Sequence, residues 1–283
     1  MNESYSKRLE RAAEIISRAE RVAIGGGAGL SAAAGLNYSG VRFTENFADF
    51  TKKYGLKDMY SATFYPYSAQ EEKWAYFSRH VLINRILPPA LPPYKDLLSL
   101  VRGKEYFVIT TNVDGQFYKA GFERERIFAV QGDYAEIQCA RACHNKVYGA
   151  EDQFKLMAET QRDCKIPRRL VPKCPVCGGN MEVHIRKDEF FIEDDAWHAA
   201  YNRYSRFISD SQDKKAAFIE AGVGYNTPSV IKYPFERFTY LNPNARLIRI
   251  NTGEPQTPPE ISERTVIFTE DAKEVIKDIG AAL

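Results

Sequence analysis

The sequence has no long apolar run, no excess of one charge and few cysteines, and each of these shortages excludes a class of protein. No apolar stretch approaches the roughly 20 residues that a membrane-spanning helix needs. Thirty-nine basic side chains nearly balance 37 acidic ones, so the whole chain lacks the charge signature of a nucleic-acid or membrane binder. Four of the five cysteines lie in two close pairs, which fits metal ligands in a reducing compartment better than a disulfide framework.

The first residues carry no export signal. The stretch MNESYSKRLERAAEII is charged from Glu3 onward and has no apolar core before a small-residue cleavage site. The chain also shows no internal repeat and no low-complexity tract. We therefore expect a cytoplasmic protein with no membrane partner, built as one large domain or as a domain that carries a smaller module.

Short apolar segments alternate with helical patterns along most of the chain. The strand candidates, most of them continuously apolar, lie at 21–27, 106–111, 126–130, 216–222, 246–251 and 265–269. Helical patterns lie at 4–19, 68–87, 91–102, 114–120, 196–212 and 271–282. Continuously apolar strands are typical of a parallel sheet covered on both faces, so the alternation predicts an α/β fold with a Rossmann-like, doubly wound parallel sheet.

One region breaks this alternation. Residues 134–190 hold all five cysteines, few strand signals and many charges. We interpret them as a small zinc-binding module inserted in a larger NAD-binding domain that comprises residues 1–133 and 191–283.

The cysteine spacing carries the metal prediction. One pair forms C-x-x-x-C and the other forms C-x-x-C within CPVCGG, and the four residues are Cys139, Cys143, Cys174 and Cys177. Four thiolates in two close pairs suit a structural, tetrahedral Zn²⁺ site. Because the first spacing is looser than usual, His144 or His184 stays open as a substitute ligand. Cys164 is interpreted as an unpaired thiol, since no His or Asn pattern marks a base beside it.

The charge of the module leaves alternatives open. Between residues 139 and 177 there are eight basic and four acidic side chains. A zinc ribbon that binds nucleic acid has such a composition, as do a solvated loop and a docking face for an acidic protein. No aromatic ladder interleaves with the basic residues, so nucleic acid ranks last and we expect no nucleic-acid partner.

A glycine-rich turn predicts a dinucleotide site. In IGGGAGLSAAAGL, the segment from Gly27 to Ala32 matches G-x-G-x-x-G/A directly after a strand, a pattern that lets backbone N–H groups approach a pyrophosphate. A flexible strand-to-helix turn is the alternative. A hydride-transferring dehydrogenase would need a strand ending in Asp or Glu about twenty residues later, but that distance falls in the polar stretch TENFADFTKKYG. The dinucleotide is therefore expected without the dehydrogenase.

A second turn carries polar side chains. TTNVDGQF follows an apolar strand, so Asn112 and Asp114 sit at its carboxyl end, where open α/β sheets place their ligands. Taken alone, the stretch is more typical of an ordinary Asn-Val-Asp-Gly turn.

The order of these signals resembles the sirtuin family. GAGLSAAAGL, TTNVDG, QGD, the paired cysteines, GVG, INTGEP and a terminal EDAKEVI follow one another as they do in sirtuins, and the resemblance covers most of the chain. It implies an NAD-consuming enzyme with a Rossmann-like domain and a small zinc-bearing domain. It also implies NAD contacts from Gly27, Ala28, Gly29 and Ser31 at the phosphates and nicotinamide ribose, from Asn112 and Asp114 at the nicotinamide, from Gly222, Gly224 and Asn226 at the adenosine ribose, and from Asn251, Asp271 and Ala272 at the adenine.

Three departures from the family pattern bear on the reaction. Asn37-Tyr38-Ser39-Gly40 replaces the usual Pro-Asp-Phe-Arg, so we expect Tyr38 to take over part of the nicotinamide-side contact. NMEVHIRKDEFFIEDD replaces the segment, ending Phe-Gly-Glu, that pairs with an acyl-lysine peptide. Gln131 replaces the histidine that acts as general base on the nicotinamide ribose, and an amide has no proton that titrates near neutral pH.

These departures bear differently on the two stages of the reaction, cleavage of the nicotinamide bond and deacylation. Cleavage of the nicotinamide bond needs a well-placed NAD and stabilisation of positive charge on the ribose, which Asn112 and Asp114 can supply. Deacylation needs a deprotonated ribose hydroxyl, whereas Gln131 offers only hydrogen bonds to that hydroxyl or to the acceptor. We therefore predict a protein mono-ADP-ribosyltransferase, with lysine deacylation or a noncatalytic NAD or ADP-ribose sensor as the alternatives.

The same combination resembles the microbial sirtuins linked to macrodomains, called class M. This resemblance implies an acceptor similar to the lipoylated H protein of glycine cleavage, a macrodomain protein as a further partner, and a setting in oxidative-stress operons.

Overall fold

The apolar segments form one parallel sheet in the computed structural model, which describes residues 3–253 and 255–283. The strand order is β3-β2-β1-β7-β8-β9, and every neighbouring pair is parallel. The strands are β1 (Arg21–Gly26), β2 (Glu105–Thr110), β3 (Ile127–Ala129), β7 (Ala216–Ala221), β8 (Arg246–Ile250) and β9 (Thr265–Phe268). The predicted Rossmann-like, doubly wound fold is therefore confirmed, with each expected strand found within two residues of its predicted bounds.

Helices cover both faces of this sheet because successive strand residues point to opposite sides. Val22 and Ile24 of β1 enter one hydrophobic cluster, whereas Ala23 between them enters another. Helices of the first cluster are α1 (Tyr5–Arg18), α2 (Ala28–Ala33), α6 (Pro92–Leu100), α7 (Gln116–Ala120) and α11 (Ala272–Ala282). The second cluster is closed by α9 (Asp195–Ser209), α10 (Lys232–Leu241) and the 3₁₀ segment η4 (Pro259–Arg264). Among the described residues, none of the helices is both apolar and long enough to cross a membrane.

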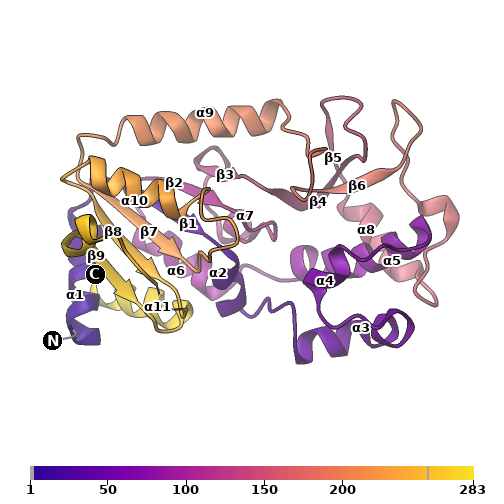
Figure 1. Ribbon diagram of the computed structural model, residues 1–283, viewed down its shortest axis with the longest axis horizontal. Coiled ribbons are helices and arrows are strands. Elements are labelled where there is room, and N and C mark those ends of the chain that lie inside the picture. The colour runs from indigo at the N-terminus through magenta and orange to yellow at the C-terminus, as the bar shows by residue number, and fades with distance from the viewer. Residues whose placement is uncertain (1–2, 254) are drawn as a thin grey trace.

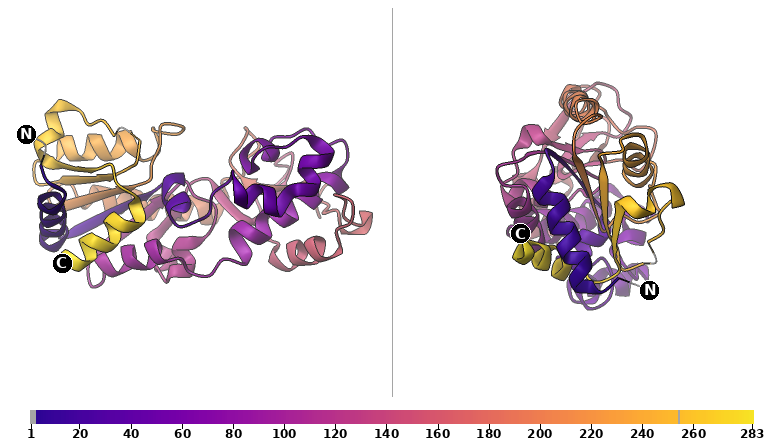
Figure 2. Two further views of the ribbon diagram at one scale, coloured as in Figure 1. Left: turned by 90° about the horizontal axis from the view of Figure 1, so that it is seen from below. Right: turned by 90° about the vertical axis from the view of Figure 1, so that its left-hand side faces the viewer.

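A smaller unit lies at the other end of the long axis (Figures 1 and 2). Its sheet is antiparallel, in the order β5-β4-β6. The sheet consists of β4 (Gly132–Cys139), β5 (Val147–Gly149) and β6 (Met181–Ile185), and α8 (Glu151–Thr160) packs beside it. The chain enters this sheet directly from β3 through the Gln131 turn, so that turn joins the two units.

The hydrophobic core of the smaller unit draws on more of the chain than the cysteine-rich region. Phe47 and Trp74 are fully buried in one cluster with Phe154 and Met181. The added elements are α3 (Val41–Tyr54), α4 (Met59–Thr63), α5 (Gln70–Val81) and the π-helical turn η1 (Leu82–Ile86). The predicted division into 1–133 with 191–283 and 134–190 stays a prediction, but side-chain packing joins helices from 41–86 to the 134–190 region.

The strand order also fixes where a ligand can bind. From β1 the chain first proceeds to β2 and β3 on one side, and later returns to β7, β8 and β9 on the other. The carboxyl ends of β1 and β7 therefore flank the point at which the strand order reverses, which is where open α/β sheets bind ligands.

Candidate functional site

The glycine-rich turn after β1 packs against the turn after β7. The N–H groups of Gly27 and Gly29 donate to the carbonyl oxygens of Ala221 (3.0 Å) and Gly222 (2.8 Å). A Cβ atom on Gly27 would lie 2.6 Å from the Gly222 oxygen, and one on Gly29 would lie 2.8 Å from the Gly222 Cα. Gly222 itself has a φ of +63°, which favours glycine. The glycines thus let two turns meet at the switch point, a contact that the sequence pattern alone did not indicate.

Asp114 lies buried beside this turn at the end of β2. Its Oδ2 accepts a 2.5 Å hydrogen bond from the Ser31 hydroxyl, and its Oδ1 accepts one of 3.0 Å from the Gln116 N–H. The Tyr94 hydroxyl lies 3.1 Å from Ser31 Oγ and 3.4 Å from Asp114 Oδ2. Burial raises the pKa of Asp114 above that of an ordinary aspartate, and the Ser31 hydrogen bond opposes the rise. The site therefore contains a carboxylate held by three donors at the sheet edge.

Asn112 is fixed by the same group of side chains. Its Nδ2 donates to the Gly27 carbonyl at 2.9 Å and to the Tyr94 hydroxyl at 3.3 Å. Its backbone N–H donates to Thr110 Oγ1 at 3.0 Å. The structure thus brings Asn112, Asp114 and Ser31 together and adds Tyr94 from α6, which no motif marked. The contacts of these residues with NAD stay predictions.

Tyr38 reaches the site from the segment before α3. Its hydroxyl lies 3.0 Å from that of Tyr134 on β4, and its ring stands edge-on to the fully buried His80. The N–H of Tyr134 donates to the Val113 carbonyl at 3.0 Å. Tyr38 is therefore placed beside the Asn112 turn, and its contact with nicotinamide stays a prediction.

Gln131 precedes a turn that only glycine can make. Gly132 has a φ of +90°, and a Cβ atom there would collide with the carbonyl oxygen of His184. The Gln131 carbonyl accepts a hydrogen bond from the Arg186 N–H at 3.0 Å. Within the described chain, its half-buried side-chain amide has no hydrogen-bond partner. Gln131 is thus a turn residue, and its contact with a ligand stays a prediction.

The two polar turns are neighbours. Asn112, Asp114, Gly132 and Asp133 line one small pocket. Asp133 forms a buried ion pair with Arg85, which the sequence did not mark because the partners are separated by 48 positions and come from different elements.

The residues predicted for the adenosine side follow β7, β8 and β9 at the same sheet edge. Asn251 donates from Nδ2 to the Val223 carbonyl at 2.8 Å and accepts from the Gly253 N–H at 3.1 Å. Asp271 caps α11 by accepting from the Lys273 N–H at 2.9 Å, and Ala272 after it is buried. Gly224 and Asn226 lie exposed in the turn after β7. The structure gives Asn251 and Asp271 roles in holding their turns, and their contacts with NAD stay predictions.

A network of buried charged side chains lies at the end of β7, next to the turn that follows this strand. Glu220 accepts from Lys232 Nζ at 2.6 Å and from Arg249 Nη2 at 2.8 Å, and all three side chains are almost completely buried. Arg249 also pairs with Glu236 at 2.9 Å. No sequence motif indicated this network, because Glu220 and Arg249 lie on different strands and Lys232 and Glu236 lie on helix α10.

The four paired cysteines converge. Their Sγ atoms all lie within 4.8 Å of one another, with Cys139–Cys177 at 3.8 Å and Cys143–Cys174 at 3.6 Å. A tetrahedral zinc with Zn–S bonds of about 2.3 Å requires sulfur separations of about 3.8 Å. The chemistry of the donor set and these two separations therefore fit a zinc ion.

The alternative ligands are placed differently. His184 lies outside the cysteine cluster, with Nδ1 3.2 Å from Glu136 and Nε2 2.9 Å from the Ile192 carbonyl. His144 Nδ1 lies 3.1 Å from Cys143 Sγ, while its Nε2 contacts the Tyr148 hydroxyl. Cys164 is buried in the core of the smaller unit, and burial raises its pKa to about 11, so it is a protonated thiol at neutral pH.

Comparison with known proteins agrees with this geometry. A sequence model of the Sir2 family matches residues 27–216. The chain is 40% identical over 272 residues to a Staphylococcus aureus protein named protein ADP-ribosyltransferase, covering 96% of this chain and 86% of that one. It is 31% identical over 269 residues to a Fusarium oxysporum f. sp. cubense protein named probable bifunctional ADP-ribose hydrolase/ADP-ribosyltransferase, covering 89% of this chain and 43% of that one.

Solved structures share the fold at low identity. A structure from work on the mechanism and regulation of Sir2 enzymes superposes with a TM-score of 0.60 at 17% identity, covering 98% of both chains. A Sir2 homologue in complex with NAD superposes with a TM-score of 0.59 at 18% identity, covering 99% of this chain and 94% of that one.

Proposed function

The chain belongs to the Sir2 family of NAD-dependent enzymes, and from that premise we propose that it is a protein mono-ADP-ribosyltransferase that releases nicotinamide. The observation that carries the proposal is Gln131, which stands where the family pattern has its histidine base. The name of the Staphylococcus aureus relative supports the same activity.

In the proposed reaction, the bond between nicotinamide and ribose C1′ breaks and a bond from C1′ to the acceptor nucleophile forms, while the acceptor loses its proton. Asn112 and Asp114 stabilise the positive charge that develops on the ribose, because a fixed amide dipole and a buried carboxylate act strongly in a site from which water is excluded. Ser31 and Tyr94 hold the carboxylate in place. The Gln131 amide orients a ribose hydroxyl or the acceptor.

Deacylation is disfavoured because none of the four histidines takes the place of the missing base. His80 is fully buried, and burial lowers its pKa to about 3, so it is a very weak base. His184 is engaged by Glu136 and the Ile192 carbonyl. His144 lies beside the cysteine cluster, and His198 packs against Trp197 on α9.

The segment that replaces the peptide-pairing strand is folded onto its own unit. The Gln138 side chain donates to the Phe190 carbonyl at 2.6 Å and accepts from the Ile192 N–H at 3.0 Å. The Phe191 ring stacks on His184 with 4.5 Å between centroids. Backbone groups at 190 and 192 are thus already satisfied, which supports a protein acceptor other than an extended acyl-lysine peptide.

We further propose that the four-cysteine cluster holds a structural zinc ion. Cys139, Cys143, Cys174 and Cys177 supply the thiolates, and the Gly179 N–H and the Arg141 guanidinium lower the pKa of Cys177 to about 6. A closed set of four thiolates leaves no position for substrate, so the ion would hold the 139–145 and 173–179 turns together.

The proposed acceptor is a lipoylated carrier similar to the glycine-cleavage H protein, with a macrodomain protein that removes the modification. The name of the Fusarium relative pairs ADP-ribose hydrolase with ADP-ribosyltransferase in a chain more than twice as long, which supports such a pairing of activities. Localisation in the cytoplasm and a setting in oxidative stress stay predictions.

The test uses NAD labelled in its adenylate phosphate, the purified protein, and two forms of the carrier. We expect label on the lipoylated carrier and little on the same carrier with its lipoyl-lysine replaced by arginine. Equal labelling of both forms would overturn the lipoylated acceptor but keep transfer, whereas no protein label together with nicotinamide release would overturn transfer itself.

A further inference from the structure

We propose that Arg85 is a positioning residue for the reaction. Its side chain contacts both the Asn112 turn (residues 111–115) and the Gln131 turn (residues 130–133), and these contacts fix the position of one turn relative to the other. The proposal rests on cleavage of NAD, which the proposed function shares with the whole family, and does not depend on the acceptor. Neither the sequence motifs nor the family resemblance marks Arg85.

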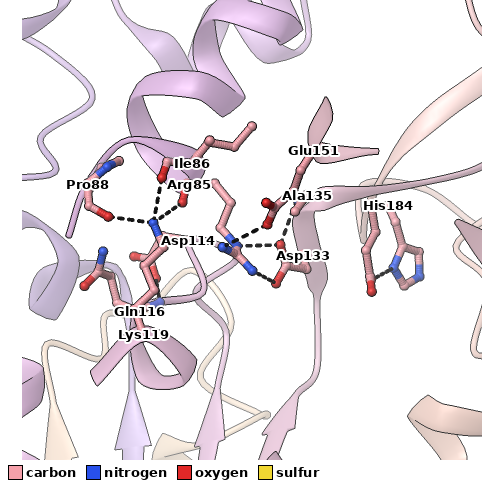
Figure 3. A network of polar contacts seen from close by, with 11 residues as sticks. Arg85, Ile86, Pro88, Asp114, Gln116, Lys119, Asp133, Ala135, Glu151 and His184 are labelled. Atoms are coloured by element: carbon pink, nitrogen blue, oxygen red, sulfur yellow. Dashed lines mark hydrogen bonds and ion pairs between the residues drawn. The ribbon is translucent and has the colours of Figure 1, made fainter. Parts of the chain in front are cut away.

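The contact of Arg85 with the Gln131 turn is a bidentate ion pair with Asp133 (Figure 3). Arg85 Nε donates to Asp133 Oδ1 at 2.8 Å and Arg85 Nη2 donates to Asp133 Oδ2 at 3.1 Å. Asp133 Oδ1 also accepts from the Ala135 N–H at 2.7 Å. Both ionic side chains are about 90% buried, so a planar fork and a carboxylate fix the start of β4 two residues after Gln131.

The contact of Arg85 with the Asn112 turn is made at Gly115. A Cβ atom on Gly115 would collide with the Arg85 guanidinium, and Gly115 has a φ of +66°. The guanidinium therefore lies directly on the turn that carries Asn112 and Asp114. Among the described residues, the Asn112 turn and β4 share one backbone hydrogen bond, from the Tyr134 N–H to the Val113 carbonyl. The Arg85 side chain adds a further contact between this turn and β4.

Arg85 is itself anchored by an unusual helix end. It lies in η1, a π-helical turn, and such turns are rare and frequent at functional sites. Lys119 Nζ donates to the carbonyl oxygens that follow, those of Arg85 at 2.5 Å, Ile86 at 3.0 Å and Pro88 at 2.6 Å. One lysine thus satisfies three carbonyls that a helix end leaves open and fixes the backbone from which the Arg85 side chain extends (Figure 3).

Arg85 and Asp133 act with opposite sign on Asp114. The negative charge of Asp133 raises the pKa of Asp114 and the positive charge of Arg85 lowers it, both less than burial does. The groups that face Asp114 or act on its charge come from each element around it: Ser31 on α2, Tyr38 before α3, Arg85 on η1, Tyr94 on α6, Lys119 on α7, and Asp133 and Tyr134 on β4. Among these, only Arg85 and Asp133 form an ion pair whose halves can be removed separately.

The test measures nicotinamide release against pH at saturating NAD, without acceptor protein. Arg85→Gln should reduce the rate at the optimum by about 10-fold or more, because small errors of placement cost up to about 10²-fold. It should also move the acid limb of the pH–rate profile to higher pH, because the charge of Asp133 then raises the pKa of Asp114 without the opposing charge of Arg85. Asp133→Asn should move the acid limb to lower pH, because the raising charge is lost and the lowering charge stays.

Two further variants separate charge from geometry and guard against a simple folding defect. Arg85→Lys keeps the charge but not the fork, so we expect an acid limb near that of the wild type with a reduced rate. The double variant Arg85→Gln/Asp133→Asn removes both charges of the buried pair and leaves neither unpaired. It should therefore fold, release nicotinamide slowly and have the same acid limb as the wild type. Arg79→Gln, which removes a bidentate pair with Asp49 between α5 and α3, is the matched control and should leave rate and profile unchanged.

A purely structural role for Arg85 predicts a different result. All variants would then lower the melting temperature while the folded fraction releases nicotinamide at the wild-type rate with an unchanged pH profile. That outcome, or shifts of the acid limb in the same direction for Arg85→Gln and Asp133→Asn, would overturn the proposal. A carrier that is not modified would leave it standing, because no acceptor enters the assay.

Discussion

At the scale of single residues, the central feature is a buried carboxylate whose charge is maintained by its neighbours. Asp114 is 4% exposed, and burial disfavours its ionised form. Ser31, the Gln116 N–H and Tyr94 oppose this by hydrogen bonding. We expect these donors to help keep Asp114 ionised where a cationic ribose would form in the proposed reaction, so that they act in catalysis as well as in the fold.

Ser31→Ala tests this balance. The Ser31 hydrogen bond lowers the pKa of Asp114, so its loss should raise that pKa further. Because the ionised form is the active one and is lost as pH falls through the pKa, the acid limb of nicotinamide release should move to higher pH. The profile is measured at saturating NAD, and an unchanged limb would mean that Asp114 does not set it.

Asn112→Ala tests the proposed role of the amide in nicotinamide cleavage. The variant should lose about 10²-fold or more in the rate of nicotinamide release, as expected for loss of a group that acts in the transition state. Asn46→Ala, which removes an amide bonded to the Arg42 carbonyl on α3, is the matched control. Near-normal release by Asn112→Ala would place the active site elsewhere.

Gln131 is tested with two substitutions that remove or replace its amide. Gln131→Ala should reduce transfer to the acceptor, because the variant lacks the amide that we propose to hydrogen-bond the ribose or the acceptor. Gln131→His should gain little deacylase activity, because the 186–194 segment stays folded onto Gln138 and His184. An efficient lysine deacylase from this single change would show that the missing base alone sets the reaction, and normal transfer by both variants would reduce Gln131 to a turn residue.

At the scale of elements, the strands of the large sheet were predictable, whereas the part that helices from 41–86 take in the smaller unit was not. Residues 106–109 are apolar without a break, which indicates burial on both faces without knowledge of neighbouring strands. Helix α10 escaped notice because its sequence KYPFERFTYL contains proline and aromatic residues, and helix propensity was overridden by packing. Helix α3 has an amphipathic pattern, and nothing local indicates which of the two cores receives its apolar face.

The cysteine cluster provides the test at this scale. If it holds zinc, Cys174→Ser should release about one ion per chain and lower the melting temperature, because metal binding and folding are coupled in such modules. Zinc content by mass spectrometry checks this. Cys164→Ser is the matched control, since Cys164 is equally buried but lies outside the cluster, and it should keep the metal. Preparations of Cys174→Ser with full metal content would rule the site out.

At the scale of the whole molecule, the candidate site lies where the two units join. The motif residues Asn112 and Asp114 were predictable because each follows an apolar strand and the carboxyl ends of parallel strands share one edge. Arg85, Tyr94 and Tyr134 were not, because they reach the site through contacts between elements distant in sequence. Sequence order thus indicated the family and its motif residues, whereas the side chains that contact those residues could be identified only from the fold.

The most direct test of the account offers the protein both possible substrates at once. Adenylate-labelled NAD is supplied with the lipoylated carrier and an acyl-lysine peptide in equal amounts, and label is followed into protein and into O-acyl-ADP-ribose, with Asn112→Ala as the blank. We predict that label enters the carrier and that O-acyl-ADP-ribose stays at the level of the blank. Label that appears chiefly in O-acyl-ADP-ribose would contradict the account, because it would show a working deacylase without the histidine base.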